Sequence, residues 1–440
     1  MKKLLTGAAL TAALLWSLTA GAQGILYQRV PFASTPNPVG SGARAVGWGG
    51  AFIAVADDAT AASWNPAGLV QLITPETSVA LSYHNRLEQL TFEGYNADAE
   101  SASIAAANLN YASAVYPFHV GEVNMVASLN YQRLYEFDRS LKYTVRGANS
   151  LGENFLQDRA FDQSGALTTV TPAFAIQITP QWAMGLSVNF WGLDSLGGGW
   201  DQQFQVTETL NPGLATKIRS WSENQESYEF SGVNYVIGTH LKVQNFTIGA
   251  VYKTSFEADV KYRAKNELSQ FAPFNPALNY TSQFNQNEDE TLTWPESYGL
   301  GVAYRFSDRL SFAADAYSTR WSRYILHTKN GDLNLITGDQ STNVQDTWQA
   351  RAGAEYLWIT PKYVFALRGG AFYDPEPLAD QVNQFYGAAV GGGLVYQNLV
   401  LDAALQFRWA SDLKGEQVEN VQAITNVQDY FGIVSLIYHF

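Results

Sequence analysis

The sequence contains no cysteine among its 440 residues. A chain without cysteine has no disulfide framework and no thiolate that could bind a metal or act as a nucleophile. Its five histidines are scattered without the spacing of a metal site, and there is no GxSxG motif. We therefore expect no metal, no cofactor and no enzymatic activity.

Basic residues and long apolar runs are also scarce. The 27 Lys and Arg residues are outnumbered by 40 Asp and Glu residues, which argues against a nucleic-acid partner. The one long apolar run follows the basic start MKK and precedes the small residues Ala20-Gly21-Ala22. This pattern predicts a secretory signal peptide over residues 1–22 rather than a membrane anchor, because the run is short for a span.

Aromatic residues are plentiful at 14%, and the chain alternates with a period of two. From Leu399 to Trp409, every second residue is apolar, while Asp402 and Arg408 fall on the other side. Successive side chains of a strand point to opposite faces, so this pattern predicts strands with one apolar face.

Fourteen such segments follow one another, and their connections alternate between short turns and long loops. The longest predicted loops are 139–165, 193–224 and 263–287. The predicted strands cover residues 76–85, 102–117, 121–138, 166–179, 181–192, 225–243, 245–262, 288–306, 309–327, 344–359, 362–374, 384–397, 399–410 and 428–440.

This arrangement indicates an all-β fold, a transmembrane antiparallel β-barrel of about 14 strands over residues 75–440. Outer-membrane barrels combine an even strand number, short periplasmic turns, long outer loops and an apolar outer band. Short turns after the even strands place both termini in the periplasm. An aromatic last residue, here Phe440, is common in such barrels.

Residues 23–74 precede the first strand and are predicted to form a plug in the lumen. A barrel of this size encloses more space than its own side chains fill. Gly49 and Gly50 would allow a close approach to the wall, and Asp57 or Asp58 would cap a short helical turn. The triplet Asn65-Pro66-Ala67 either ends that turn or anchors the plug to the wall.

The segment GARAVGWGGAFIAVADDATAASWNPAGL resembles the plug of the FadL/TodX family of outer-membrane transporters for hydrophobic compounds. The resemblance continues in WPESYGLGVAYRFSDRLSFAADAYSTRWSRY and LRGGAFYDPEP. It implies energy-independent uptake of long-chain fatty acids or other apolar molecules. The steps would be capture by the outer loops, binding in the lumen, movement of the plug and sideways exit near a kink in the third strand. Residues 121–138 contain no internal glycine or proline that would mark this kink.

The expected partners follow from the same resemblance. They are an apolar small molecule, the lipid and lipopolysaccharide of the outer membrane, and the barrel assembly machinery, which would read the strand ending in Phe440. We expect a monomer.

Two groups of side chains are candidates for ligand contacts. Asp315, Arg351 and Arg368 point inward on successive strands and form either an ion network or a site for a substrate carboxylate. The long loops carry exposed apolar residues that would form a capture groove or pack together as a lid: Trp200, Phe204, Leu210, Trp221, Phe271 and Phe274.

Three alternatives stay open from the sequence. The GARA and NPA motifs also resemble PorV-like barrels, which act as anchors or shuttles in protein secretion. A general porin would share the barrel but lack a plug. A lipid-hydrolysing barrel would need a catalytic group around the inward-facing His84, although a lone histidine is more often structural.

Overall fold

The computed structural model describes residues 35–92, 96–99, 102–148, 152–193, 198–211, 214, 217–336, 343–418 and 421–440. The predicted signal peptide, residues 1–22, and the first part of the predicted plug, residues 23–34, lie outside these ranges.

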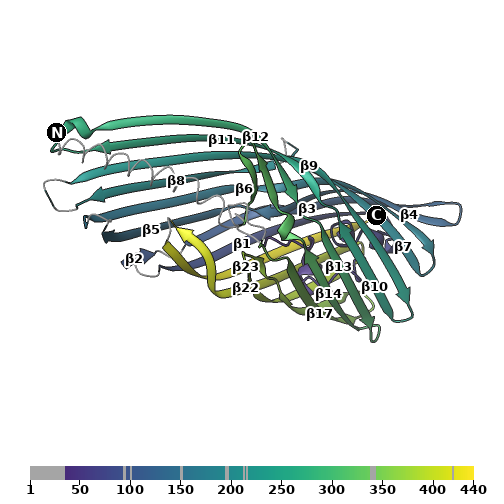
Figure 1. Ribbon diagram of the computed structural model, residues 1–440. Helices are drawn as coiled ribbons and strands as arrows, with labels where there is room; N and C mark the ends of the chain where they lie inside the picture. Colours follow the sequence, from purple (N-terminus) through teal and green to yellow (C-terminus); the bar gives the residue numbers. More distant parts are fainter. Residues whose placement is uncertain are drawn as a thin grey trace.

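Fourteen antiparallel strands form the wall of a closed barrel (Figure 1). Each pairs with the next, and β1 pairs with β23 to close the circle, which confirms the predicted fold and strand number. The wall strands are β1 (Glu76–Phe92), β3 (Ala102–Val120), β4 (Val123–Glu136), β6 (Asn154–Thr179), β7 (Trp182–Trp191), β9 (Ile218–Val243), β10 (Phe246–Lys253), β13 (Ser297–Arg305), β14 (Leu310–Thr319), β17 (Thr347–Ile359), β18 (Val364–Tyr373), β21 (Tyr386–Tyr396), β22 (Leu399–Val418) and β23 (Val421–His439).

The outer face of the wall is apolar and the inner face is polar. On β22, Leu401 and Leu405 are exposed, whereas Asp402 and Arg408 are buried inside the barrel. Exposed aromatic residues lie near both ends of the outer face. Examples are Trp409 on β22 and Tyr438 on the neighbouring strand β23. The step from Leu399 to Trp409 is about 33 Å along the strand and, with the usual tilt, about 25 Å along the barrel axis, which matches the height of the apolar band of such barrels.

Seven further strands extend the sheet beyond the wall, at the end away from the short turns (Figure 1). The expected loops 139–165, 193–224 and 263–287 are therefore wrong. Most of the described residues in these ranges form paired strands instead. On β12 polar side chains occupy both faces, whereas on β8 the apolar residues Trp200, Phe204 and Val206 share a face that also carries Gln202. The added strands are β2 (Asn96–Ala99), β5 (Arg139–Ala148), β8 (Gly198–Leu210), β11 (Phe256–Phe271), β12 (Tyr280–Trp294), β15 (Ile325–Thr328) and β16 (Gly331–Asn334).

Three predicted strands, 245–262, 288–306 and 309–327, are each broken in two. The first leaves the wall at Thr254, where the N–H of Thr254 bonds to Tyr235 O and the Tyr235 N–H bonds to Thr254 Oγ1. The second breaks at Pro295, which has no N–H to give to a neighbouring strand. The third is divided by a helical turn over Trp321–Arg323. In each case one part stays in the wall and the other joins the extension.

The helical elements are short. They are α2 (Ala43–Gly47), α3 (Ala61–Trp64), η1 (Pro66–Gln71), η2 (Pro276–Leu278) and η3 (Trp321–Arg323), and a small hairpin joins β19 (Glu376–Pro377) to β20 (Val382–Asn383). Within the described ranges, no helix is long and apolar enough to cross a membrane.

Candidate functional site

The N-terminal segment, residues 35–74, lies inside the barrel, because it bonds to strands from around the wall. Tyr111 Oη on β3 donates to Ala59 O, and Ser187 Oγ on β7 donates to Ala62 O. Two strands from β3 in the other direction, the Ala43 N–H donates to Ser435 Oγ on β23 over 2.6 Å. These contacts hold the segment against β3, β7 and β23.

Asn65 joins this segment to the wall through its side-chain amide. The Nδ2 group donates to Ile53 O (3.0 Å) within the segment and to Thr239 O (2.9 Å) on β9. Its Oδ1 accepts from the N–H of Ala67 (3.2 Å), which caps η1. Asn65 is fully buried, so it acts both as the helix cap and as a link to the barrel.

The wall facing the segment is lined by glycines. A methyl group at Gly238 would lie 2.1 Å from Asn65 Oδ1. Comparable contacts with backbone atoms of the segment, all under 3 Å, would arise at Gly185, Gly249, Gly353 and Gly370. The backbone of the segment therefore rests directly on the wall, and larger residues there would push it away.

The other predicted plug residues serve different purposes. Gly49 and Gly50 have φ of 67° and 77°, a conformation that favours glycine, and both lie against wall residues. Asp58 caps the turn before α3 by accepting from the N–H and Oγ1 of Thr60 (2.8 and 2.6 Å). Asp57 does not cap, because it pairs with Arg44 on α2.

Asp315 and Arg351 are cross-strand neighbours that hold the N-terminal segment. Asp315 Oδ2 accepts from the N–H groups of Phe52 (2.6 Å) and Ile53 (2.8 Å). Arg351 Nη1 donates to Gly49 O over 3.2 Å. Both side chains are buried, and both form hydrogen bonds with the backbone of the N-terminal segment.

Arg368 is not part of the same group. It lies one strand further along the wall, where it bonds to Glu355 (2.6 Å) and Asp402. All three side chains are buried. With two carboxylate partners, Arg368 fits an ion network better than it fits a site for a substrate carboxylate.

A small cavity lies above the segment, where the lumen meets the extension. Residues 36–39, which we call the strap, form one side, and the cavity volume is about 60 Å³. Aromatic rings of the mouth cluster pack around it, with Trp294 at 5.1 Å from Tyr135 and 6.2 Å from Trp191 between ring centroids. The mouth cluster comprises Tyr135, Phe137, Trp191, Trp200, Tyr228, Phe230, Phe256, Trp294, Trp321 and Tyr324.

Lys253 on β10 also lines this cavity. Its Nζ group donates to Pro38 O and Val39 O of the strap, each over 3.3 Å. Among the described residues, no carboxylate lies within ion-pairing distance of this amine, in contrast to the arginines of the lumen. Sequence alternation places Lys253 inward, but nothing in the sequence distinguishes it from the paired arginines.

The predicted capture residues do not form one groove. Trp200, Phe204 and Leu210 share one face of β8, where Trp200 stacks on Phe137 at 4.5 Å between ring centroids. Trp221 lies opposite Thr207 and therefore on the other face of the sheet. Phe271 and Phe274 are exposed at the end of β11.

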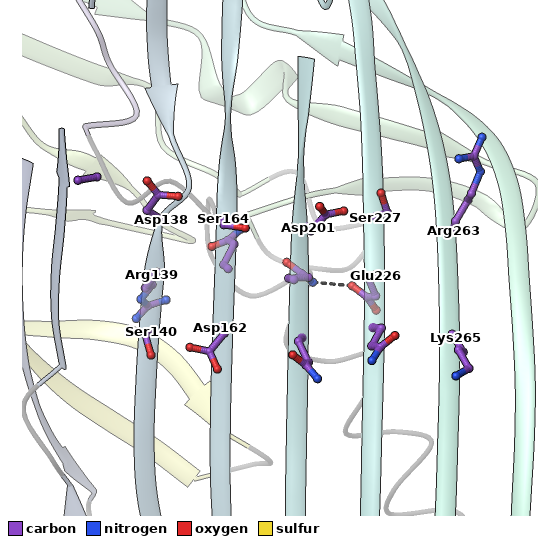
Figure 2. Close-up of a pocket in the computed structure, with 15 residues that line it drawn as sticks. Asp138, Arg139, Ser140, Asp162, Ser164, Asp201, Glu226, Ser227, Arg263 and Lys265 are labelled. Carbon is purple, nitrogen blue, oxygen red and sulfur yellow. Dashed lines mark hydrogen bonds between the residues drawn. The ribbon is translucent and has the colours of Figure 1, made fainter. Parts of the chain in front are cut away.

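A larger cavity of about 730 Å³ crosses β5, β6, β8, β9 and β11 (Figure 2). Acidic, basic, amide and hydroxyl side chains line it, including Asp162, Asp201, Arg263 and Lys265. Charged side chains lose hydration when an apolar molecule covers them. The smaller aromatic cavity is therefore the better site for an apolar ligand.

The comparisons with known proteins agree with this architecture. The sequence profile of the family described as outer membrane protein transport protein (OMPP1/FadL/TodX) matches residues 39–425. The chain belongs to this family. Members of the FadL/TodX family are outer-membrane transport channels for hydrophobic compounds and not enzymes.

Solved structures share the fold at low sequence identity. A Pseudomonas aeruginosa FadL homologue has a TM-score of 0.62 at 15% identity, covering 93% of this chain and 99% of that one. The P. putida toluene transporter TodX has a TM-score of 0.60 at 15% identity, with 92% and 99% covered. The Ralstonia pickettii toluene transporter TbuX has a TM-score of 0.52 at 17% identity, with 92% and 99% covered. No curated protein matches the sequence.

This FadL/TodX family barrel has an irregular seam between β3 and β4. Their pairing ends at Tyr111 and Gln132, although β3 continues along β1 and β4 continues along β6. Extra residues bulge on both sides of the seam, Asn110 in β3 and Leu134 in β4. A bulge needs neither glycine nor proline, which explains why the sequence of the third strand gives no sign of it.

Side-chain amides of β3 bridge the seam where the backbone pairing is missing. Asn108 Nδ2 donates to Glu136 (3.4 Å), and Asn110 Nδ2 donates to Arg133 O (3.5 Å). Glu136 in turn pairs with Arg133 over 2.5 and 2.6 Å. Such long amide bonds are weaker than the strand ladder that they replace.

Proposed function

We propose that the protein takes up long-chain fatty acids, or similar apolar molecules with an anionic group, without an energy source. The cargo would be captured at the extension, bound in the aromatic cavity, and released sideways through the seam. The observation that carries this proposal is Lys253, a cation in an aromatic cavity that has no carboxylate partner within the described part of the chain.

The cavity volume supports a step in which the strap moves. About 60 Å³ holds a few water molecules, whereas a dry cavity of about 150 Å³ binds benzene. Residues 36–39 form one side of the cavity. A ligand of any useful size therefore enters only when the strap shifts.

Lys253 would couple that shift to the ligand. Its amine now bonds to two neutral carbonyl groups, Pro38 O and Val39 O. A carboxylate is a stronger acceptor than a carbonyl, because charge-assisted hydrogen bonds are roughly twice as strong. An anionic ligand would thus replace the strap at Lys253, while the aromatic rings would cover the apolar chain. The strap would also have to release Asn37, which accepts bonds from Trp321, Thr347 and Gln349.

The seam supports the sideways exit. Gln132, Leu134 and Tyr135 on β4 line the cavity, and the β3–β4 pairing stops at Gln132. Apolar molecules gain about 25 cal/mol per Å² on leaving water, so exit into the bilayer is favoured over exit into an aqueous space.

We also propose the orientation and the remaining partners. Short turns and both termini would face the periplasm, and the extension would face outward. Contact with lipopolysaccharide, assembly through the strand ending in Phe440, and a monomeric state stay predictions.

Uptake of labelled oleate and toluene by cells with and without the gene tests the function. Lys253→Met should weaken oleate uptake about tenfold or more at low concentration, because a charge-assisted bond contributes roughly 1.5–3 kcal/mol. Toluene uptake should change little. Lys261→Met is the matched control, since Lys261 lies on the extension and pairs with Glu229. Unchanged uptake of both compounds in the deletion strain would refute the transport role, and equal effects of Lys253→Met on both would refute the role of the amine.

A further inference from the structure

The end of the β11–β12 hairpin is an uncharged, exposed aromatic tip. No Asp, Glu, Lys or Arg occurs from residue 268 to residue 287. Within this stretch, Phe271 and Phe274 are 53% and 46% exposed, and η2 buries none of its residues. Charged residues flank the stretch on both strands, with Lys265 and Glu267 on β11 and Glu288 on β12.

The tip also satisfies many of its own backbone groups. Asn279 Oδ1 accepts from the Ala272 N–H (2.7 Å), and Asn275 Oδ1 accepts from the Ala277 N–H (3.2 Å). Gln270 Nε2 donates to Leu278 O over 2.8 Å. The two prolines of the tip, at positions 273 and 276, have no N–H to satisfy. A segment with internally bonded polar groups enters an apolar medium at low cost, as in membranes.

The hairpin carries this tip far from the barrel. β11 runs for 16 residues from the mouth cluster, which is about 50 Å along a strand. β11 and β12 reach the end of the molecule opposite the short turns (Figure 1). The tip therefore points away from the bilayer that surrounds the wall.

We propose that this tip contacts the surface of droplets of a water-insoluble apolar liquid, from which the cargo enters the protein. The inference rests on the proposed uptake function, since a transporter of apolar cargo meets that cargo as a separate phase. Two half-exposed phenylalanines and an absence of charge fit an apolar liquid surface, and the flanking charges limit the depth of insertion. Cargo could then pass along the sheet without dissolving in water.

The absence of cysteine allows a direct test with one introduced thiol. Ala277→Cys in the full chain, reconstituted in lipid nanodiscs, carries an environment-sensitive NBD label at the tip. Hexadecane droplets should shift its emission to the blue. A label at Gln244, in a short turn at the opposite end, should show no shift.

The double variant Phe271→Ser/Phe274→Ser should need at least about tenfold more droplet surface for the same shift. The reason is that each phenylalanine ring would bury its exposed half in the droplet, and serine would not. Ile73→Ser is the matched control, since Ile73 is exposed at the other end of the molecule. No shift with droplets would overturn the proposal. So would a shift caused by protein concentration alone, which indicates a second copy, or one seen only with phosphatidylcholine vesicles, which indicates a membrane.

Uptake measurements separate this proposal from the proposed function. The double variant should lose uptake from droplets but keep uptake of cargo supplied as a cyclodextrin complex. If the unaltered protein imports neither form, the transport function fails, whereas the emission shift still reports on the tip alone.

Discussion

Asn65→Asp is the sharpest test of how the N-terminal segment is held. The substitution preserves the size of the side chain and the Oδ1 atom that caps Ala67. It removes the Nδ2 donor, so that Ile53 O and Thr239 O lose their bonds of 3.0 and 2.9 Å. The new carboxyl oxygen also faces these two carbonyl oxygens.

The expected cost follows from burial. Each lost bond is worth about 1 kcal/mol, and a buried carbonyl left without a donor adds about 1–3 kcal/mol. We expect the attachment to weaken by about 3 kcal/mol in total, which raises the population of detached segment about 100-fold. The wall strands are paired through their own backbone and should keep their stability.

Limited proteolysis measures that population. When opening is fast compared with cleavage, the cleavage rate follows the fraction of open molecules. Cleavage within residues 35–74 should therefore accelerate about 100-fold in Asn65→Asp, while thermal unfolding of the barrel changes little.

Asn275→Asp provides the matched control. Asn275 has nearly the same backbone angles as Asn65, −150° and 93° against −149° and 103°, and its Oδ1 caps Ala277 at the same distance of 3.2 Å. It lies at the exposed tip, so its substitution should change stability by no more than about 0.5 kcal/mol. Equal and small effects of both substitutions on cleavage would refute the linking role of Asn65.

Two further outcomes follow from other contacts. The backbone N of Ala43 and the Oγ of Ser435 lie 2.6 Å apart, so cysteines at both positions should form a disulfide that fixes residues 43–50 to the wall. Uptake that survives oxidation would show that these residues need not move. Uptake that is lost until reductant is added would show that they must move. Burial and the neighbouring Glu288 raise the pKa of Glu290 on β12 to about 7. Because the carboxyl pKa is raised in the folded protein, the folded state loses stability as pH increases from about 4.5 to 7. Glu290→Gln should therefore stabilise the extension at pH 8 by less than about 1 kcal/mol and leave its stability unchanged at pH 4. Thermal melts at the two pH values measure this difference.

Local chemistry explains why the sequence predicts some parts of this site well. Asn-Pro-Ala forms the same capped turn at residues 65–67, deep in the lumen, and at residues 275–277, in solvent. The Asn side chain and the proline ring determine this geometry without help from the surroundings. The bond from Asn65 to Thr239 crosses 174 positions of sequence, so no local pattern reveals it.

The same distinction separates the wall from the extension. Wall strands such as β22 show alternation because one face meets lipid and the other meets the lumen. Strand β12 has polar residues on both faces along most of its length, so its sequence looks like a loop. Pairing with β11, and not burial of an apolar face, makes it a strand.

Charge pairing is likewise beyond the reach of alternation. Arg351 and Lys253 both point inward, but only the path of the N-terminal segment decides their partners. Arg351 bonds to Gly49 and lies near Asp374, whereas Lys253 meets the carbonyl groups of the strap. A prediction based on parity alone therefore cannot distinguish the surroundings of Arg351 from those of Lys253.

The way the N-terminal segment is held favours exit through the wall over exit through the lumen. Residues 43–50 of the segment rest on wall glycines such as Gly353 and Gly370, and the backbone contacts there leave no room for a passing ligand. The strap is held at Lys253 by two bonds that a carboxylate can replace, and at Asn37 by bonds with side chains that include Trp321 and Gln349. In the proposed mechanism, moving the strap would open the cavity toward Gln132, where the β3–β4 pairing ends. This path would require the bonds at Lys253 and Asn37 to break, whereas a path past residues 43–50 would require the glycine contacts to break.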